Sequence, residues 1–387
     1  MLKLIKNADI YSPAPLGVGH LLIGGEQILY VGGTLPAVDA SLLSETLDLE
    51  GAPLIPGLID CHVHVTGGGG EDGFSTQAPA VPLSRFTRHG VTSVVGLLGT
   101  DDETRSTANL LARTRALREE GLSAWCWTGG YHLPPTTLTG SVRRDIVNID
   151  CIIGLGELAI SDHRSSQPSF DELARLASEV HVAGLLSRKA GVVHLHLGDG
   201  ERGLELVRKL LGETELPPRV FHPTHVNRRK ELYEEACALS LRNVVIDVTA
   251  FPVEENDNAW SAADAWERYH ENGGPVSGLT ISSDGGGCLP VFDGNGEMVK
   301  MDFATSAGLP DTLRELLARG HGFEQILPSM TVNAARLLKL QGKGLLQPGA
   351  DADLVCLDEE HHVRHVMARG CWMVQDQSPV VQGLFDD

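Results

Sequence analysis

The stretch Asp60-Cys61-His62-Val63-His64 follows the apolar run Leu54-Ile55-Pro56-Gly57-Leu58-Ile59 and precedes a glycine tract at residues 67–70. An apolar run that stops abruptly before a glycine-rich segment is typical of a buried strand and its end. Because residues two apart on a strand point to the same face, His62 and His64 are expected to project side by side. Two such imidazoles are either half of a metal site or simply two polar residues at a strand end. The histidines and carboxylates further along the chain favour the metal site.

Length and composition narrow the class of protein. The chain has 387 residues, of which 42% are hydrophobic, and this is enough for a large barrel with an accessory domain. A net charge of −20 argues against nucleic acid or an anionic membrane as the main partner. No apolar run reaches the length of about eighteen residues that a transmembrane helix needs, and residues 1–6 lack the apolar core of a signal peptide, so a cytoplasmic protein is expected. Seven scattered cysteines fit a reduced compartment rather than a disulfide framework or a cysteine-rich zinc module.

From Leu54 onward, apolar runs alternate with amphipathic stretches of helical length. This alternation predicts an α/β protein, specifically a (β/α)8 TIM barrel. The expected strands lie at residues 54–59, 91–97, 123–127, 152–155, 192–197, 220–225, 244–249 and 279–283. The expected helices lie at residues 102–120, 170–183, 203–211, 230–241, 259–272, 302–318 and 333–340. A nucleotide-binding doubly wound sheet is the weaker alternative, because the sequence has no Gly-x-Gly-x-x-Gly after its first strand and no P-loop.

The two ends of the chain have a different pattern from the middle. Short apolar runs with glycine turns fill the first fifty residues, and a strand-rich stretch begins again at Gly349. The simplest arrangement pairs both ends in one small β-sandwich domain, made of residues 1–53 and 345–387. The barrel, residues 54–344, is then inserted between the two halves of that domain.

Histidines and carboxylates stand at the ends of several expected barrel strands, where the catalytic groups of such barrels lie. These residues are His62, His64, Glu157, His196, His225 and Asp284. Nitrogen and carboxylate ligands without thiolate suit zinc, and less often manganese, iron or cobalt. Six ligands exceed the need of one zinc ion, and two ions about 3.5–4 Å apart would use all of them. The other histidines, His163, His194 and His222, are expected to be packed or hydrogen-bonded.

This combination resembles the amidohydrolase superfamily, and within it the isoaspartyl dipeptidases. The similarity covers nearly the whole chain, from Pro56-Gly57-Leu58-Ile59-Asp60 to the closing segment at residues 344–354. The motifs that carry it are long, and they are Gly67–Glu71, Gly90–Thr100, Thr128-Gly129-Gly130-Tyr131-His132, Ala159–Ser165 and Pro223–Arg228.

The resemblance implies a set of site residues and an assembly. It implies metal ligation by His62, His64, His196, His225 and Asp284. It implies substrate contacts by a second set, which comprises Gly69, Gly70, Glu71, Thr100, Tyr131, Arg164 and Arg228. It also implies a homo-oligomer, commonly an octamer.

Two positions depart from the pattern of the isoaspartyl dipeptidases. The family bridges its metals with a carboxylated lysine at the end of strand four, where this chain has Glu157. The charge is kept, but the side chain is about 4 Å shorter. Either the backbone comes closer, which Gly156 would permit, or one metal binds weakly. A family serine that contacts substrate falls on Cys288, whose thiol is a poorer hydrogen-bond donor.

The expected reaction is metal-dependent hydrolysis of the β-aspartyl amide bond of a dipeptide. Zinc, two ions per subunit with Glu157 as the bridge, would lower the pKa of bound water toward about 7. Asp284 is expected to carry the proton to the leaving amine, and Tyr131 to stabilise the charge on the amide oxygen. Arg164 and Arg228 suit carboxylates, and Glu71 suits an α-ammonium group.

Two alternative functions stay open. One is another amidohydrolase activity, such as that of a dihydroorotase-like cyclic amide hydrolase or an N-acyl-amino-acid deacylase. The other is an inactive homologue that serves as a binding protein, which would be expected to lack ligands.

Overall fold

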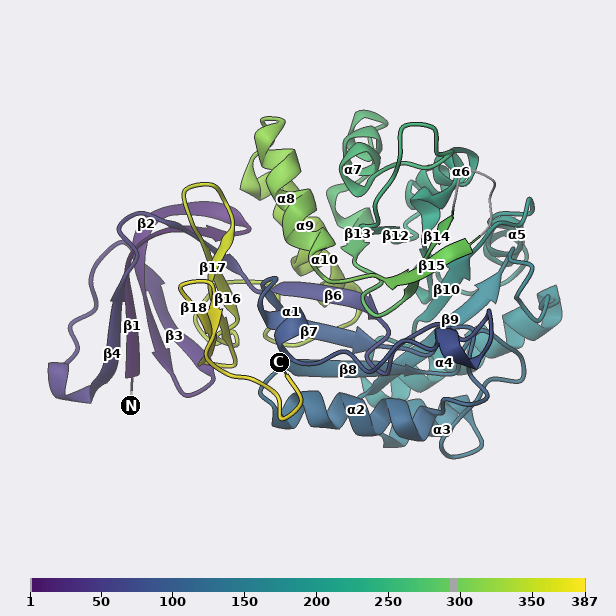
Figure 1. The fold of residues 1–387 in the computed structure, drawn as a ribbon, viewed down its shortest axis with the longest axis horizontal. Helices are drawn as coiled ribbons and strands as arrows, with labels where there is room; N and C mark the ends of the chain where they lie inside the picture. The colour runs from purple at the N-terminus through teal and green to yellow at the C-terminus, as the bar shows by residue number, and fades with distance from the viewer. Residues whose placement is uncertain (1, 293–297, 387) are drawn as a thin grey trace.

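A curled sheet of parallel strands forms the centre of the molecule (Figure 1). The computed structural model describes residues 2–292 and 298–386. The parallel strands are β6 (Leu58–Val63), β7 (Val91–Gly96), β8 (Ser123–Thr128), β9 (Ile152–Ile160), β10 (Val193–Leu197), β11 (Phe221–Thr224), β12 (Ile246–Thr249) and β13 (Leu279–Ser282). Strands β11 to β6 form one sheet, and β12 pairs with β13. Because β11 also contacts β12 and β13 contacts β6, the strands curl round a common interior.

All eight expected strand segments contain a strand, but the first one is divided. Residues Pro53–Pro56 form β5, which pairs with the two ends of the chain, and the central sheet begins only at Leu58. The break falls at Gly57, where a Cβ atom would lie 2.1 Å from the Thr92 hydroxyl oxygen. The apolar run at residues 54–59 therefore belongs to two sheets, and the chain passes from the terminal sheet to the central sheet at Gly57.

Helices connect the central strands and cover their outer face (Figure 1). They are α1 (Ser84–Thr87), α2 (Thr107–Glu119), α3 (Val142–Asn148), α4 (Phe170–Ser187), α5 (Glu205–Glu213), α6 (Lys230–Ser240), α7 (Ala262–Glu271), α8 (Gly308–Ala318), α9 (Phe323–Met330) and α10 (Val332–Leu337). The helix expected from residue 302 begins only at Gly308, because β15 (Met298–Phe303) pairs with β14 (Cys288–Phe292) as a hairpin. Helices α1, α3 and α9 were not predicted, and all three are short.

Both ends of the chain meet in one nine-stranded sheet. Its strands are β1 (Leu2–Ser12), β2 (Ala14–Gly24), β3 (Gln27–Gly32), β4 (Leu43–Asp48), β5, β16 (Leu354–Leu357), β17 (Val363–Ala368), β18 (Cys371–Gln375) and β19 (Ser378–Pro379). Strand β16 runs antiparallel beside β5, so the carboxyl-terminal strands continue the sheet that the amino-terminal strands began. The predicted pairing of the two chain ends is therefore present.

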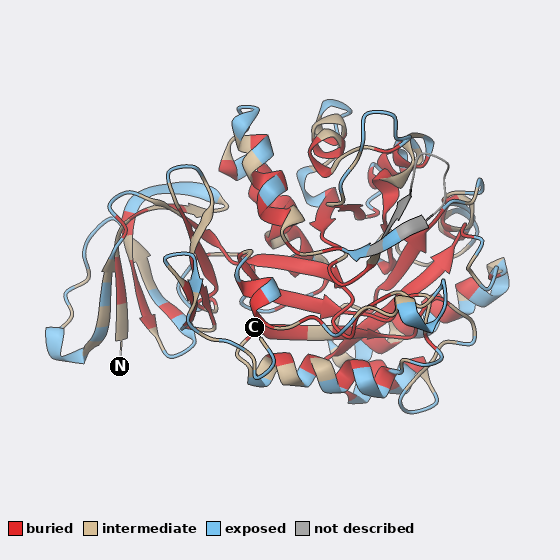
Figure 2. Ribbon diagram, in the orientation of Figure 1, coloured by how far each residue is buried: buried red, intermediate tan, exposed pale blue. Residues whose placement is uncertain are grey.

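Burial follows the two parts of the molecule. The central strands are buried at every residue except Trp125 in β8, whereas the helices bury only the face that packs on them (Figure 2). A separate hydrophobic cluster, including Ile10, Leu21 and Leu354, lies in the terminal sheet. Helix α4 illustrates how local sequence sets an element, since Ser169 and Glu172 form a capping box at its start.

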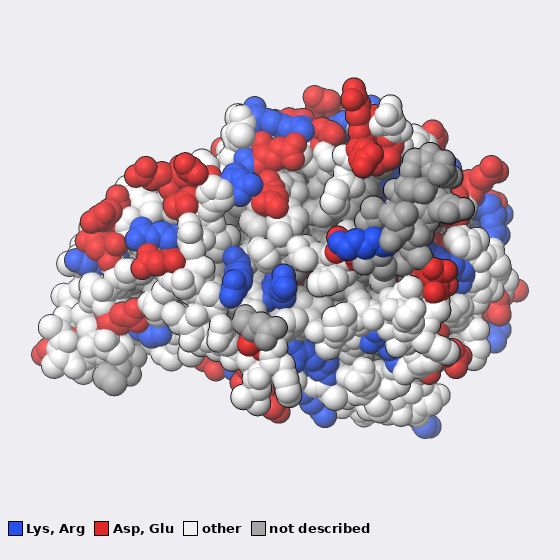
Figure 3. All heavy atoms as spheres, in the orientation of Figure 1, with Lys and Arg blue, Asp and Glu red and all other residues white. Residues whose placement is uncertain are grey.

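The surface carries charges of both signs. Among the described residues drawn in Figure 3, acidic groups gather along the upper edge of the view, and basic groups are scattered between them. Within residues 2–292 and 298–386, no helix combines the length and the apolar character needed to cross a membrane.

Candidate metal and substrate site

The first predicted metal ligands meet at the carboxyl ends of β6 and β13. His62 lies in β6, His64 follows it, and both are buried. Their Nε2 atoms lie 3.2 Å and 3.1 Å from Oδ1 of Asp284, which follows β13. These three side chains form one cluster that could hold a metal ion.

Glu157 connects this cluster to the remaining histidines. Its Oε1 lies 3.5 Å from Nε2 of His64, and its Oε2 lies 3.7 Å from Nε2 of His62. The same Oε2 lies 3.0 Å from Nδ1 of His196 and 3.5 Å from Nε2 of His225. One carboxylate thus contacts all four histidines that the sequence predicted as ligands. His62, Glu157 and His225 form a second cluster that could hold a metal ion, and His196 stands beside it.

The position of Glu157 has a local cause in β9. Between Leu155 and Leu158, three residues of β9 span the distance that two residues span in β10. Such a bulge changes the direction in which a strand points its side chains. Gly156 allows the close approach, because a Cβ atom there would lie 2.7 Å from Cβ of His194. From this bulge the side chain of Glu157 reaches all four histidines.

Two of the predicted ligand residues occupy the left-handed backbone region. His225 has φ of 59° and Asp284 has φ of 55°, and each comes directly after a central strand or one residue beyond it. Non-glycine residues in this region cost energy and cluster at functional sites. The ring of His225 is further held by its Nδ1, which lies 2.7 Å from Oγ1 of Thr249, so that Nε2 faces Glu157.

The donor atoms fit a bound cation. Among the described residues, His62 Nε2, Glu157 Oε1 and Asp284 Oδ1 are buried and have no hydrogen-bond partner. Buried polar atoms without partners are costly unless another group satisfies them. Ligand atoms at about 2.1 Å from a tetrahedral zinc ion would be about 3.4 Å apart. The distances of 3.1 to 3.7 Å around Glu157 and Asp284 agree with that spacing.

The electrostatics of the site also favour a cation. Burial opposes ionisation of Glu157 and Asp284, but the surrounding histidines outweigh it and hold the pKa of both carboxyl groups well below the usual range. Burial likewise opposes protonation of His62, yet the nearby carboxylates raise its pKa to about 9. Both carboxylates are therefore charged at neutral pH, and a positive charge between them is stabilised.

Tyr131 contacts the ring of His196. Its hydroxyl oxygen is 2.8 Å from Nδ1 of His196, and the second ring nitrogen of that histidine lies 3.0 Å from Oδ2 of Asp162. Burial and the charge of Glu157 raise the pKa of Tyr131 well above its usual value. The phenol therefore keeps its proton and remains a hydrogen-bond donor.

Asp162 was not predicted as a site residue, and it pairs with Arg164, one of the predicted substrate contacts. Its two carboxylate oxygens accept from Nε and Nη2 of Arg164 at 3.0 Å and 2.7 Å. The remaining Nη1 of Arg164 lies 3.3 Å from Oε1 of Glu71. Two groups of opposite charge that were predicted to contact substrate therefore face each other. The signal for Asp162 was available, because it lies two residues before Arg164 in a motif already singled out.

The glycine tract packs against Cys288. Gly69 and Gly70 have φ of 79° and 99°, which glycine adopts readily, and a Cβ atom on Gly69 would lie 2.3 Å from Sγ of Cys288. The Cys288 thiol is half-buried and lies 3.6 Å from the carbonyl oxygen of Thr76. Burial raises the pKa of Cys288 to about 11, so the sulfur is a neutral thiol at pH 7.

The last two predicted substrate contacts also lie at this mouth. Thr100 follows Gly99, where a Cβ atom would lie 2.7 Å from Cε1 of His64. Arg228 follows β11, and its Nη1 lies 3.5 Å from Nε2 of His196. The structure thus brings the predicted metal and substrate residues together at one end of the central sheet.

The three histidines that were expected to play no direct part lie elsewhere. His194 and His222 are fully buried and hydrogen-bonded below the site. Burial lowers the pKa of His222 to about 4, and that of His194 falls well below its usual value, so both rings are neutral. His163 is exposed, and its Nδ1 lies 2.8 Å from Oδ2 of Asp199.

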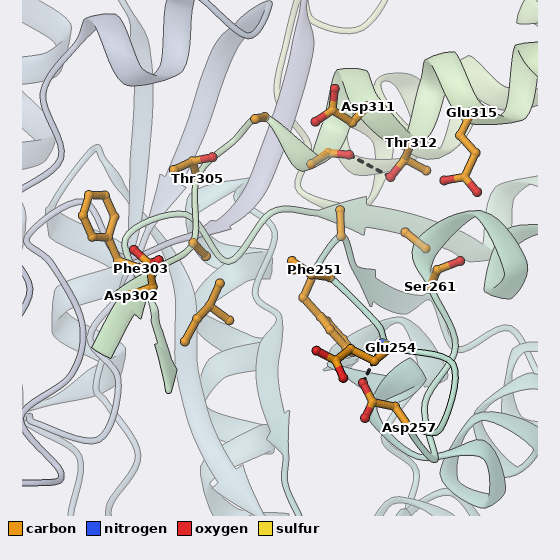
Figure 4. Close-up of a pocket in the computed structure, with 17 residues that line it drawn as sticks. Phe251, Glu254, Asp257, Ser261, Asp302, Phe303, Thr305, Asp311, Thr312 and Glu315 are labelled. Carbon is orange, nitrogen blue, oxygen red and sulfur yellow. Dashed lines mark hydrogen bonds between the residues drawn. The ribbon is translucent and has the colours of Figure 1, made fainter. Parts of the chain in front are cut away.

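A cavity of about 940 Å³ adjoins α7, α8 and the segment after β12 (Figure 4). Its lining includes several carboxylates, namely Glu254, Asp257, Asp302, Asp311 and Glu315. All the predicted metal and substrate residues lie outside this lining. The site is therefore distinct from the cavity.

Comparison with known proteins identifies a family and solved structures that are similar to this chain. The model of the amidohydrolase family matches residues 54–383. The β-aspartyl dipeptidase of the thermophilic, keratin-degrading Fervidobacterium islandicum AW-1, in complex with the β-Asp-Leu dipeptide, is 40% identical to this chain. That match covers 99% of this chain and 100% of the other, with a TM-score of 0.91.

More distant proteins are also similar to this chain. An imidazolonepropionase of Ruegeria sp. (strain TM1040) is 25% identical over 369 residues, which cover 88% of this chain and 86% of the relative. The dihydropyrimidinase of Brevibacillus agri NCHU1002 is 19% identical over 98% of this chain and 96% of the other, with a TM-score of 0.68. At that identity the likeness extends to the fold alone.

Proposed function

This chain belongs to the amidohydrolase family, and within it to the isoaspartyl dipeptidases, and we propose that it hydrolyses the β-aspartyl amide bond of dipeptides with bound metal. One observation carries this proposal. Side chains suited to a metal converge beside a single pair of opposite charges, and these residues are His62, His64, Glu157, His225 and Asp284 next to Glu71 and Arg164.

In this proposal, the protein holds two zinc ions per subunit. His62, His64 and Asp284 would hold one, His196 and His225 would hold the other, and Glu157 would bridge the two. The contacts of Glu157 with all four histidines support its role as the bridge. When bound, the ions supply acidified water and polarise the amide carbonyl group.

Asp284 and Tyr131 are the residues that act on the reacting atoms. Asp284 is ionised at neutral pH, so it can accept the proton of the attacking water and pass it to the leaving amine. Tyr131 keeps its phenolic proton and can donate a hydrogen bond to the amide oxygen as negative charge develops there.

Glu71 and Arg164, which lie beside the proposed metal site, would bind the charged groups of the substrate. Glu71 suits the α-ammonium group of a β-aspartyl residue, and Arg164 and Arg228 suit carboxylates. Because Glu71 and Arg164 lie 3.3 Å apart, a substrate that carries both charges would exchange one ion pair for two. Thr100, Gly69, Gly70 and Cys288 would line the space around it.

The alternatives fit less well. A dihydroorotase-like cyclic amide hydrolase or an N-acyl-amino-acid deacylase would use the same metal ligands. Neither has a need for an ammonium-binding carboxylate paired with a guanidinium, as in Glu71 and Arg164. An inactive homologue is disfavoured because the ligand side chains are present and face one another.

Several structural expectations belong to the same proposal. We infer that the eight parallel strands close into a (β/α)8 barrel, residues 54–344, and that residues 1–53 and 345–387 form a small β-sandwich. We also infer a cytoplasmic homo-oligomer, an octamer by resemblance to the family.

A comparison of β-Asp-Leu with α-Asp-Leu, using zinc-loaded protein, tests the proposed substrate class. Release of leucine from the β-linked dipeptide alone is the expected result. Hydrolysis of dihydroorotate or N-acyl amino acids with no turnover of β-Asp-Leu would refute it. Asp284→Ala should abolish most turnover without unfolding, and Asp311→Ala, in the neighbouring cavity, is the matched control that should remain active.

A further inference from the structure

A chain of buried hydrogen bonds begins at the inner nitrogen of His62. His62 Nδ1 lies 2.8 Å from Nε2 of His194, and His194 Nδ1 lies 2.9 Å from Nδ1 of His222. His222 Nε2 lies 3.0 Å from Oγ1 of Thr280. All four residues are fully buried, so water does not compete for these contacts.

The chain ends at Asp247, which is also fully buried. Its Oδ1 accepts from the Thr280 hydroxyl at 2.5 Å, and its Oδ2 accepts from Thr224 and Ser282 at 2.7 Å and 2.6 Å. A carboxylate has no proton to donate. Asp247 therefore sets the direction of every bond that leads to it.

That direction can be followed back to His62. Since Thr280 donates to Asp247, it must accept from Nε2–H of His222. A neutral imidazole has one N–H, so Nδ1 of His222 accepts from Nδ1–H of His194. Nε2 of His194 then accepts from Nδ1–H of His62. In the neutral ring of His62, which is the form that binds a metal ion, the outer nitrogen Nε2 then has a lone pair that faces Asp284 and Glu157.

Packing holds the middle of the chain in place. The indole of Trp127 stacks on the ring of His194, with centroids 5.2 Å apart and an interplanar angle of 8°. The interior of such barrels is usually filled by branched apolar side chains. Imidazoles and a carboxylate in that place are costly unless every hydrogen bond is made. A hydrogen-bonded network of polar side chains in the interior therefore indicates a role other than packing.

We propose that His194, His222, Thr280 and Asp247 form a directional relay that keeps His62 in the tautomer able to bind metal. These are positioning residues, because they act through His62 and do not touch the reacting atoms. The inference rests on the proposed function, in that it requires His62 to be a metal ligand. A ligand histidine commonly donates its second N–H to a carboxylate or carbonyl oxygen. Here two further histidines and a threonine stand between the ligand and the carboxylate.

Zinc affinity, measured by competition with a chromophoric chelator, tests the relay without reference to turnover. Thr280→Val removes the hydroxyl that links His222 to Asp247 and keeps the shape of the side chain. The expected result is zinc binding weakened by about 10-fold or more, although the changed atom is three hydrogen bonds from His62. Thr280→Ser, which restores the hydroxyl, should restore the affinity.

Thr114→Val is the matched control. Thr114 is equally buried, and its hydroxyl donates to the carbonyl oxygen of Leu110 at 2.8 Å, outside the relay. Its loss should leave zinc affinity unchanged. A double variant completes the design, because His222→Phe already cuts the relay. In that background Thr280→Val should have no further effect if it acts through His222.

The outcomes separate the two proposals. Zinc bound by Thr280→Val as tightly as by the wild type, or additive effects of Thr280→Val and His222→Phe, would overturn the relay. A wild-type protein that binds no zinc would overturn both proposals. Zinc binding that depends on the relay, with no hydrolysis of β-Asp-Leu, would refute the function and keep the relay.

Neutron diffraction from the zinc-loaded wild type gives a test that needs no variant. Deuterium is expected on Nδ1 of His62, on Nδ1 of His194 and on Nε2 of His222. Deuterium on Nε2 of His194 would contradict the relay, because the bond to His62 would then run in the opposite direction.

Discussion

Single nitrogen atoms decide what each histidine of this site can do. An imidazole that donates from one nitrogen has only the other to offer to a metal. His225 is held by Thr249 and His62 by His194, so that Nε2 of each faces the carboxylates. His196 differs, because one nitrogen faces Glu157 and Tyr131 and the other faces Asp162. Which nitrogen each predicted ligand histidine presents therefore depends on the residue that is hydrogen-bonded to its other nitrogen.

Tyr131→Phe tests the phenol at the scale of one atom. The change removes the donor near the amide oxygen and keeps the ring, so turnover of β-Asp-Leu should fall by about 10²-fold or more. Steady-state kinetics measures the effect. Tyr269→Phe also loses a hydroxyl, which donates to the carbonyl oxygen of Pro275, and should keep full activity. Near-normal turnover in Tyr131→Phe would show that the phenol has another role.

Asp60 links residue chemistry to the pH dependence of stability. Burial raises its pKa to about 6, although the hydroxyl groups of Ser283 and Ser306 oppose the shift. In the unfolded state the pKa of this carboxyl group is about 3.9. The folded state therefore binds the extra proton, and this contribution is complete below about pH 4 and is lost as pH rises through about 6.

Asp60→Asn replaces the carboxyl group with an amide that does not titrate. Relative to this variant, the metal-free wild type should lose on the order of 2 kcal/mol of unfolding free energy between about pH 4 and pH 6. Denaturant unfolding of both proteins at several pH values measures the difference. A difference that stays constant with pH would mean that the carboxyl group of Asp60 does not titrate in this range.

The ends of the central strands are the elements that build the site. His62 and His64 belong to the end of β6, Glu157 to β9, and Asp284 to the turn after β13. Parallel strands place all their carboxyl ends at one edge, and so residues far apart in sequence meet there. The bulge in β9 adds a finer adjustment, because it moves a short side chain toward four histidines.

Gly156→Ala tests the bulge as an element. The new methyl group would lie 2.7 Å from Cβ of His194 and 3.1 Å from its carbonyl oxygen, so β9 and β10 would have to separate. We expect a loss of about 1–3 kcal/mol of stability and a lower zinc content after dialysis. Elemental analysis and thermal unfolding measure the two effects. Gly212→Ala in α5, with no atom within 4 Å of the new methyl group, is the control that should keep both. Unchanged zinc content in Gly156→Ala would show that the bulge is not needed for zinc binding.

At the scale of the whole molecule, the chain passes from the terminal sheet to the central strands after β5 and returns to the terminal sheet between α10 and β16. β5 pairs with β1 and β16, and after Gly57 the chain enters the central sheet at β6. The first predicted ligand residues, His62 and His64, thus stand only a few positions beyond Gly57. A metal ion bound at this place would stabilise the central strands from which the predicted ligands come.

Metal removal tests this dependence on the whole protein. A ligand that binds only the folded state stabilises it by about 2.7 kcal/mol when its free concentration is 100 times the dissociation constant. Zinc should therefore raise the melting temperature of chelator-treated protein in calorimetry. Magnesium at the same concentration should raise it far less, since it prefers oxygen ligands and octahedral geometry. Equal melting temperatures with and without zinc would argue against a metal site formed by folding.

The sequence by itself determined much of the architecture and the composition of the site. Eight apolar runs that alternate with amphipathic stretches predicted the parallel strands, because strand and helix periodicities are local properties. The residues at the run ends predicted the ligands, because carboxyl ends of parallel strands share one edge. The pairing of both chain ends also followed from local patterns of short strands and glycine turns.

Only the tertiary structure decided the contacts between groups that no spacing relates. The division of the first apolar run at Gly57 depends on Thr92 in a neighbouring strand. The meeting of Glu71 with Arg164, and the relay from His62 to Asp247, depend on which side chains face each other across the interior. Such contacts depend on distances of a few ångströms between side chains of separate elements. The periodicity of the sequence predicts the elements but does not predict which of their side chains meet.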